Sequence, residues 1–470
     1  MDTNPANESP SAPAVDDSVL DLNATLALFE RLCNLLVRSE SEEPVGSPVP
    51  AATLFDRLDL MPPSDGIGPQ ELALKLADIV AATPKTATPL FFNQLFGGRD
   101  WAAVLGDLLV PVLNNSMYTY KVAGVHVLIE QVLVQKMGAL MGYEQPGGVF
   151  GPGGSLSNLT AMSLARNQAE QTARESGMNG KTHRIYTSAT SHYSIRKSAG
   201  LLGIGRNNVV KVAVDDRGRM RPEALRIAIE KDLAEGHLPT MVNATLGTTV
   251  EGAYDPIRPL AELCKRHGIW LHLDGAWGAS LVLCPEYASL FEGAEEADSI
   301  TWDAHKMMGV PLTSSVLLTR KQEALTQGLT ERADYLFQQD SDWLNPGTRS
   351  LQCGRRNDFL KVWTAWQVHG DLGYAERLRH LRALTTHAVD IVRADPRLTL
   401  TLEPESLNVC FTVQGNDSPT ICQRLHEQGR ILVGFGEVHG QTVVRVIFVN
   451  PDLTRADVTH FFEQVLVVAD

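Results

Sequence analysis

The chain has 470 residues, of which 44% are hydrophobic and 20% charged, a balance typical of globular proteins with a buried core. This content excludes global disorder, and the length allows about two or three domains. Lys and Arg number 41 against 55 Asp and Glu, a net charge of −14. That balance argues against a nucleic-acid or anionic-membrane surface.

The six cysteines are scattered and form no CxxC pair or Cys/His cluster. The pattern predicts reduced thiols, without a disulfide framework or a metal site. The first basic residue is Arg31, so the N-terminus lacks the basic region of a secretory signal. No apolar run reaches about 18 residues. We therefore expect a cytoplasmic protein without a membrane span.

The N-terminal part of the chain is expected to be helical. Residues 1–17 are rich in Pro, Ser, Asn and Asp and are predicted to form a disordered acidic tail. Apolar residues recur at helical spacing over 21–38, and a second helix is predicted to begin at Pro69, after a polar connection over 39–52. The segment 18–87 is too small to form a hydrophobic core of its own, so it must pack on another surface.

Strands and helices alternate through the middle of the chain. Strands are predicted over 183–187, 208–214, 240–245, 269–274, 299–302 and 314–319, with helices over 158–174, 222–234 and 257–267. This alternation predicts an α/β fold with a mostly parallel sheet. The last hundred residues predict helices over 374–395, 419–429 and 455–467 and strands over 409–413 and 443–449. We expect a large domain over 88–370 and a small C-terminal α+β domain over 371–470.

Two motifs place reactive side chains at the ends of predicted strands. Lys306 follows the strand at 299–302 and is preceded by His305. Asp274 ends an apolar strand, where a buried carboxylate is costly unless paired and where open α/β sheets bind ligands. Taken singly, each has a structural alternative: Lys306 as part of a surface pair at a strand end, and Asp274 as a helix N-cap.

Two further motifs precede predicted helices. The glycine-rich segment 151–158 runs into a helix, whose N-terminus favours an anion such as a phosphate. His192 follows the strand at 183–187, although a lone histidine there is more often structural. Pyridoxal 5′-phosphate (PLP) requires a phosphate cradle, a carboxylate for its ring nitrogen and a lysine for attachment. The four motifs together supply these parts.

The chain resembles the group II PLP-dependent amino acid decarboxylases, in the branch that includes glutamate decarboxylase and cysteine sulfinate decarboxylase. The similar stretches, which span about four fifths of the chain, are 91–95, 117–120, 151–162, 191–194, 243–256, 274–278, 302–312, 335–339, 352–355 and 445–451. The resemblance implies the aspartate aminotransferase-like fold of type I PLP enzymes. It also implies a homodimer with the active site at the subunit interface, where the N-terminal helices would pack on the partner.

The resemblance also implies roles for individual residues. Lys306 matches the lysine that attaches the cofactor, and Asp274 matches the residue that keeps the ring nitrogen protonated. His192 matches the histidine stacked on one ring face, with Ala276 on the other. The remaining cofactor positions are Gly154, Ser155, Thr248 and His305. Many relatives have Asn-Pro where this chain has Asp303-Ala304, a departure expected to alter local geometry more than chemistry.

Two polar residues match positions that act on the substrate. Tyr335 matches a tyrosine on a mobile loop that protonates the substrate carbon after CO2 is lost, and a buried structural tyrosine is the alternative. Arg445 lies inside an apolar strand and matches a carboxylate clamp. An internal Arg–Asp pair is the alternative for Arg445.

Three positions bear on the choice of substrate. Phe96, Ser116 and Tyr118 together resemble cysteine sulfinate decarboxylases, whereas glutamate decarboxylases more often carry Ser, Asn and Phe there. Phe96 should shorten the pocket by about one methylene, which favours cysteine sulfinate or aspartate over glutamate. Met117 departs from the cysteine sulfinate relatives, so decarboxylation of aspartate to β-alanine stays open.

We therefore expect a carboxy-lyase that converts L-cysteine sulfinate to hypotaurine, a step of taurine biosynthesis. Glutamate decarboxylation and aspartate 1-decarboxylation are the alternatives. An aminotransferase or a carbon–sulfur lyase on the same cofactor, and a non-catalytic protein on the same fold, are further alternatives. The matches at His192 and Tyr335 argue against the first pair, and the set Lys306, Asp274 and His192 argues against the last.

Overall fold

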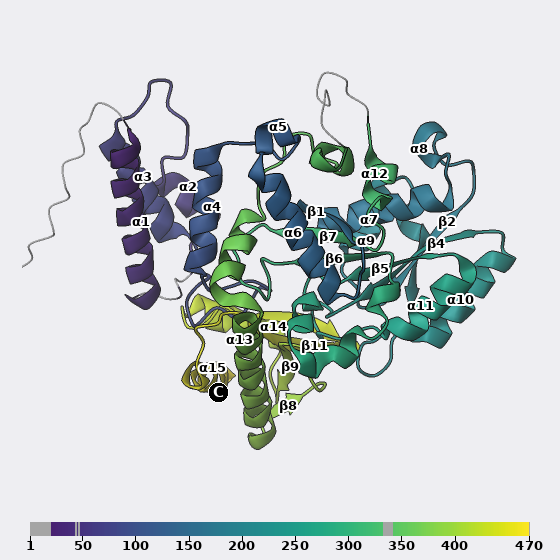
Figure 1. The fold of residues 1–470 in the computed structure, drawn as a ribbon. Helices are drawn as coiled ribbons and strands as arrows, with labels where there is room; N and C mark the ends of the chain where they lie inside the picture. The colour runs from purple at the N-terminus through teal and green to yellow at the C-terminus, as the bar shows by residue number, and fades with distance from the viewer. Residues whose placement is uncertain (1–19, 43–44, 46–47, 332–341, 470) are drawn as a thin grey trace, which may run out of the picture.

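The computed structural model describes residues 20–42, 45, 48–331 and 342–469. A large seven-stranded sheet forms the centre and a smaller four-stranded sheet contains the C-terminal strands (Figure 1). None of the helices within these ranges is long and apolar enough to cross a membrane.

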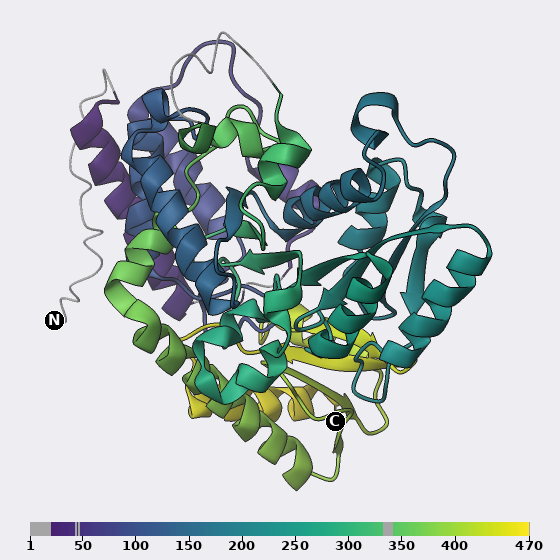
Figure 2. The same cartoon turned by 45° about the vertical axis from the view of Figure 1, so that its right-hand side comes forward.

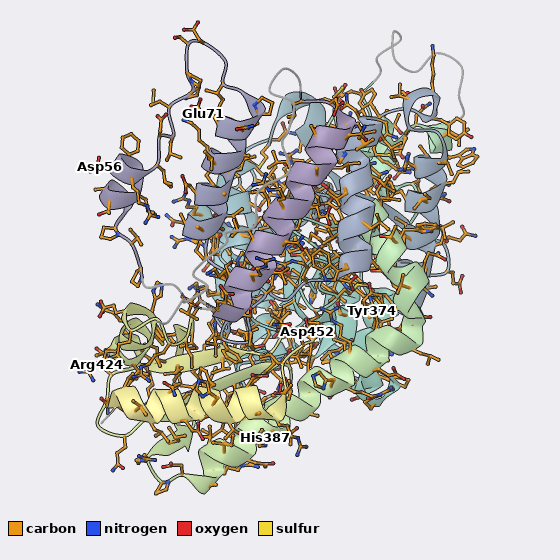
Figure 3. The ribbon with its side chains drawn as sticks, turned by 90° about the vertical axis from the view of Figure 1, so that its left-hand side faces the viewer. Asp56, Glu71, Tyr374, His387, Arg424 and Asp452 are labelled. Carbon is orange, nitrogen blue, oxygen red and sulfur yellow. The ribbon has the colours of Figure 1, made fainter. Side chains whose placement is uncertain are left out.

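The N-terminal helices lie on one flank of the molecule, beside α4 (Figure 1; Figure 3). They are followed by three helices that lead into the large sheet. Their bounds are α1 (Leu22–Glu42), α2 (Ala51–Arg57), α3 (Pro69–Ala82), α4 (Trp101–Leu113), α5 (Tyr120–Ala123) and α6 (Val125–Leu140). The two predicted N-terminal helices are thus confirmed, whereas the short α2 was not predicted.

The large sheet is mostly parallel, as the alternation of strands and helices predicts. In spatial order its strands are β1 (Gly147–Gly151), β7 (Ser315–Thr319), β6 (Ser299–Asp303), β5 (Trp270–Asp274), β4 (Leu238–Thr245), β2 (His183–Ser188) and β3 (Val209–Val212). Only β7 runs antiparallel to its neighbours. The carboxyl ends of the other six strands therefore meet at one edge.

Helices from the connections between the strands, and α12 after the last strand β7, accompany the large sheet. They are α7 (Gly154–Ala169), α8 (Ala173–Ser176), α9 (Ser194–Leu201), α10 (Pro222–Ala234), α11 (Ile257–His267) and α12 (Ala324–Leu329). The pair α7 and α9 and the pair α10 and α11 each pack together and against strands. Figure 2 shows the two pairs on opposite sides of the sheet.

The glycine-rich strand β1 was not predicted, because glycine has a low strand propensity. Its glycines are required by close packing. A Cβ on Gly147 would lie 2.5 Å from Thr319 Oγ1, and one on Gly148 would lie 2.8 Å from a methyl carbon of Val134 on α6. β1 packs closely against both β7 and α6. This close packing explains why β1 contains glycines, although glycine has a low strand propensity.

The C-terminal part begins with the long helix α13. Gly370 has non-helical backbone angles, with φ 62°, and divides α13 into two helical parts. The part after Gly370 corresponds to the predicted helix over 374–395, whereas the part before it was not predicted. The elements are α13 (Leu360–Ala394), β8 (Leu398–Leu400), β9 (Asn408–Val413), α14 (Ser418–Glu427), β10 (Gly434–Val438), β11 (Gln441–Ile447) and α15 (Arg455–Ala469). The strands form an antiparallel sheet in the order β10-β11-β9-β8. This part has the α+β arrangement that the sequence predicts.

Candidate active site

A cavity of about 370 Å³ lies at the carboxyl edge of the large sheet. Its walls include Gly154, His192, Asp274 and Lys306, which come from four separate segments. The strand order explains why these segments meet, since each follows or ends a strand that points toward this edge. The structure therefore brings the four motifs of the sequence together at one place.

Asp274 ends β5 and is 4% exposed. Its carboxylate accepts hydrogen bonds from Asn158 Nδ2 at 2.8 Å and from the backbone N–H of Ala276 at 3.2 Å. Asn158 lies in the second turn of α7 and is itself buried. Two donors thus fix the orientation of a carboxylate that faces the cavity.

A buried hydrogen-bond chain supports Asn158 from behind. Its Oδ1 lies 3.0 Å from Nε2 of His272, and Nδ1 of His272 lies 2.8 Å from the hydroxyl of Ser299. Because Asn158 Nδ2 already donates to Asp274, its Oδ1 accepts and His272 carries its proton on Nε2. Burial lowers the pKa of His272 to about 4, so the ring is neutral near pH 7. Neither Asn158 nor His272 was assigned a role from the sequence, because a polar residue within a helix or an apolar strand gives no sign of its distant partner.

Lys306 lies just beyond β6, and its amine is 3.2 Å from Oδ2 of Asp303. His305 Nε2 lies 3.6 Å from the same oxygen. Nδ1 of His305 lies 2.8 Å from the backbone oxygen of Ser314, and burial lowers the pKa of the ring. Asp303 is 2% exposed. The departure at Asp303 therefore puts a buried carboxylate beside the lysine.

The glycine-rich turn before α7 leaves the N-terminus of this helix accessible to an anion. Gly153 has φ 133°, a conformation that favours glycine, and no side chain caps the helix. A Cβ on Gly153 would meet no atom within 4 Å, whereas one on Gly154 would lie 2.8 Å from Asp303 Oδ2. Ser155 lies in the first helical turn and also lines the cavity. The first-turn N–H groups thus face a space that suits a phosphate.

His192 is half-buried and lines the cavity together with Ala276. These are the two residues predicted to lie against the faces of the cofactor ring. Its Nδ1 lies 3.3 Å from the backbone N–H of Ser194. Burial lowers the pKa of His192 below its usual value, while Asp274 acts in the opposite direction. His192 is therefore an imidazole on the cavity wall whose neutral form is favoured.

Arg445 lies on β11 and donates to backbone carbonyls of Asn93 and Thr249. Thr249 lines the cavity. Burial lowers the pKa of the guanidinium, and no carboxylate pairs with it within the described ranges. The alternative of an internal Arg–Asp pair is therefore wrong for that part of the chain.

Several of the predicted residues do not line this cavity. Thr248 turns its hydroxyl toward Glu251 and the backbone N–H of Ala253. Phe96 lines a neighbouring cavity of about 240 Å³, and His305 borders both.

The remaining substrate positions belong to a different segment. Ser116 accepts a hydrogen bond from the backbone of Arg355, and Tyr118 packs against Gly347. Neither is among the residues that border the two cavities in the described part of the chain. Tyr335 lies outside the described residues.

The cavity has the donor set that PLP requires. Lys306 supplies an amine, Asp274 an oriented carboxylate, and the N-terminus of α7 an uncapped set of N–H groups. The buried hydroxyl of Thr245, on the cavity wall, has no hydrogen-bond partner within the described ranges and is available to a ligand. These residues fit a phosphorylated, nitrogen-containing aromatic aldehyde.

Comparisons with known proteins agree with this geometry. Residues 59–414 match the family model described as the pyridoxal-dependent decarboxylase conserved domain. The chain is 38% identical to mouse cysteine sulfinic acid decarboxylase over 425 residues, which covers 85% of this chain and 86% of that protein. It is 34% identical to human acidic amino acid decarboxylase GADL1 over 489 residues, with 97% and 94% covered. The crystal structure of mouse CSAD superposes with a TM-score of 0.89 at 34% identity and covers 95% of this chain and 99% of that one.

The fold and the cavity thus define a PLP-dependent enzyme of fold type I. The chain belongs to the family of pyridoxal-dependent decarboxylases, and it is accordingly a carboxy-lyase with PLP as its cofactor.

Proposed function

We propose that this enzyme removes the α-carboxylate of a small acidic L-amino acid, with L-cysteine sulfinate preferred and hypotaurine as the product. Aspartate, which would give β-alanine, is the expected secondary substrate. The observation that carries the proposal is the half-buried guanidinium of Arg445 beside the cavity wall at Thr249, with no carboxylate of the described chain paired to it. A half-buried Arg without an internal anion suits a carboxylate of the substrate.

The relatives support the acidic class, since their names specify cysteine sulfinic acid and acidic amino acids. Bound PLP accepts the electron pair left on Cα when CO2 departs. Asp274 would hold the proton on the ring nitrogen, and Asn158 and Ala276 N–H orient that carboxylate. Lys306 would attach the cofactor, and His192 would lie against the ring.

Tyr335 is proposed to return a proton to Cα. Its phenol would act as the general acid once the site is closed to water. A tyrosine in that role is compatible with the histidine beside the ring, because burial lowers the pKa of His192 and disfavours its imidazolium form.

We also propose that the active enzyme is a homodimer. Large apolar side chains are exposed on α4, α6 and α13, among them Leu105 at 61%, Val112 at 76%, Val132 at 59% and Leu372 at 77%. α13 contacts both α4 and α6, so the exposed apolar residues belong to neighbouring elements, as at subunit interfaces. Ser116 and Tyr118 would then contribute to the partner's site. A monomer mass in light scattering at assay concentration would contradict the dimer.

The substrate proposal is tested by kcat/KM for cysteine sulfinate, aspartate and glutamate, measured side by side on PLP-loaded enzyme. We expect cysteine sulfinate to lead, and Phe96→Ala to shift the ratio toward glutamate by about tenfold or more, the usual effect of one methylene. Ile227→Ala, at a 54% exposed position on α10, is the control, since it removes a large apolar side chain away from the site. Preference for glutamate in the wild type would show that the enzyme instead forms γ-aminobutyrate.

A further inference from the structure

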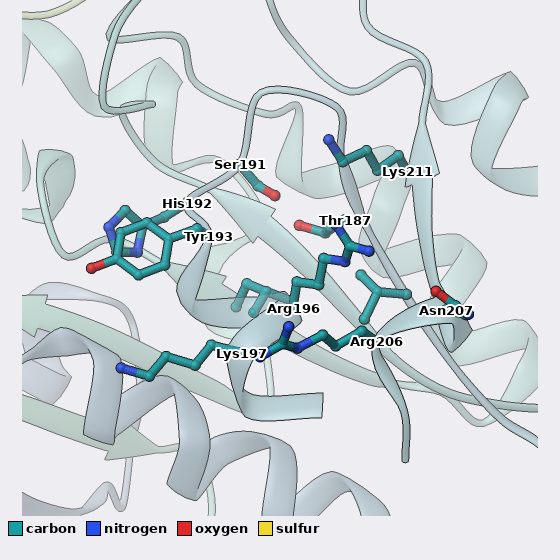
Figure 4. A pocket seen from close by; sticks show the side chains of 11 residues that line it. Thr187, Ser191, His192, Tyr193, Arg196, Lys197, Arg206, Asn207 and Lys211 are labelled. Atoms are coloured by element: carbon teal, nitrogen blue, oxygen red, sulfur yellow. The ribbon is translucent and has the colours of Figure 1, made fainter. Parts of the chain in front are cut away.

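A second cavity, of about 760 Å³, lies next to the cofactor cavity. It is formed by β2, β3, α9 and the 3-10 turn η1 (Arg206–Asn208), and Figure 4 shows its side chains. Thr187 and Lys211, which are paired across β2 and β3, both line it near the carboxyl ends of their strands. It is therefore at the same edge of the sheet as the active site, where α/β folds bind ligands.

Four cationic side chains line this second cavity: Arg196, Lys197, Arg206 and Lys211. In the part of the chain that the structure describes, none of them forms an ion pair with Asp or Glu. The chain as a whole has an excess of 14 acidic residues, and about half of the other arginines in the described ranges form ion pairs with Asp or Glu. Four uncompensated cations around one concavity focus a positive potential there.

No carboxylate is among the described residues that line this cavity, and Ser191 adds a hydroxyl donor. Arginine is suited to bidentate recognition of phosphate oxygens, and Lys adds point charges. The volume is about twice that of the cofactor cavity and falls within the range for small-molecule sites. A monoanionic amino acid would leave most of these cations unsatisfied, whereas a polyphosphate would pair with several.

We propose that this cavity is a second ligand site, which binds a small polyphosphate such as pyrophosphate or the phosphate chain of a nucleotide. His192 and Tyr193 form part of its wall, with ring centroids 4.2 Å apart, and His192 also lines the cofactor cavity. A bound polyanion would therefore act directly on the wall that the two cavities share. The site does not depend on which amino acid the enzyme decarboxylates.

Calorimetric titration of the PLP-loaded enzyme with inorganic pyrophosphate, and separately with ATP, tests the proposal. We expect saturable binding that weakens as salt is added, with Kd raised about tenfold or more in R196Q/R206Q. The matched control is K231Q/K265Q, which removes two exposed cations on α10 and α11 that already face Glu235 and Glu296. Its Kd should equal that of the wild type.

The visible absorbance of bound PLP is followed in the same titration, because the cradle at α7 also suits phosphate. Binding that releases PLP, or an equal Kd in R196Q/R206Q and the wild type, would place the anion at the cofactor cradle and overturn the proposal. Absence of saturable binding by both probes would overturn it as well. Tighter binding of ATP than of pyrophosphate would identify a nucleotide site, and equal binding a site for the phosphate chain alone.

Discussion

The contact between Asn158 and Asp274 gives the most specific prediction about catalysis. Asn158 Nδ2 lies 2.8 Å from Asp274 Oδ2, and a hydrogen bond to a charged group contributes about 1.5–3 kcal/mol. If that bond orients Asp274 toward the ring nitrogen during CO2 loss, Asn158→Ala should lower kcat by about 10- to 150-fold. Bound cofactor should remain, because Lys306 is untouched.

The isosteric change Asn158→Asp should be more damaging. It would place a second carboxylate in contact with Asp274, and two unit charges at that separation repel by about 6 kcal/mol at an effective dielectric constant of 20. The pair would then hold a shared proton near neutral pH. Asp274 would no longer be a full anion, so kcat should fall further and recover in part as the pH is raised.

The assay is CO2 release under saturating substrate between pH 6 and 9, with PLP content measured by absorbance. Asn167→Asp is the control, since it introduces the same charge on the same helix at a half-buried position bonded to Gly328. Wild-type kcat and an unchanged pH profile in both Asn158 variants would refute the positioning role of Asn158.

Other predictions concern attachment, protonation and stability. Lys306→Ala should lose the visible absorbance of attached PLP and all CO2 release; retention of either would exclude its role. Tyr335→Phe should keep PLP but form side products such as the transamination product, and clean full activity would refute the role of the phenol. Glu130→Gln should destabilise the fold by about 3–5 kcal/mol, because Glu130 and Arg355 form a buried bidentate pair; denaturant unfolding measures the change. Burial lowers the pKa of His272 in the folded protein to about 4, against an ordinary value of 6.5. As the pH falls from about 6.5 to 4, the unfolded chain therefore binds a proton before the folded protein does. The free energy of unfolding should fall by up to about 3 kcal/mol over this pH range. His272→Gln should flatten that part of the melting-temperature profile.

The strands that end at Asp274 and before Lys306 could be predicted, because an apolar run followed by a polar turn is a local pattern. That the four motifs meet at one edge of the sheet could be inferred from the parallel strands and from the resemblance to the PLP-dependent decarboxylases. By contrast, β1 is defined by contacts with Val134 and Thr319 that no local propensity encodes. The support of Asp274 by Asn158 depends on residues far apart in the chain, and so could not be read from spacing.

Thr248 illustrates the same limit at the level of one side chain. The segment around it was correctly placed near the site, since Thr245 and Thr249 line the cavity. The turn, however, directs the Thr248 hydroxyl to Glu251. Backbone geometry at a turn decides which of adjacent residues faces a ligand, and sequence alone does not specify it.

The most direct test of the central claim is product analysis of PLP-loaded enzyme incubated with L-cysteine sulfinate. We predict hypotaurine and CO2 in equal amounts, both absent with Lys306→Ala. Alanine with sulfite, or a keto acid, would show that the same cofactor and fold carry out a different reaction, and would contradict α-decarboxylation.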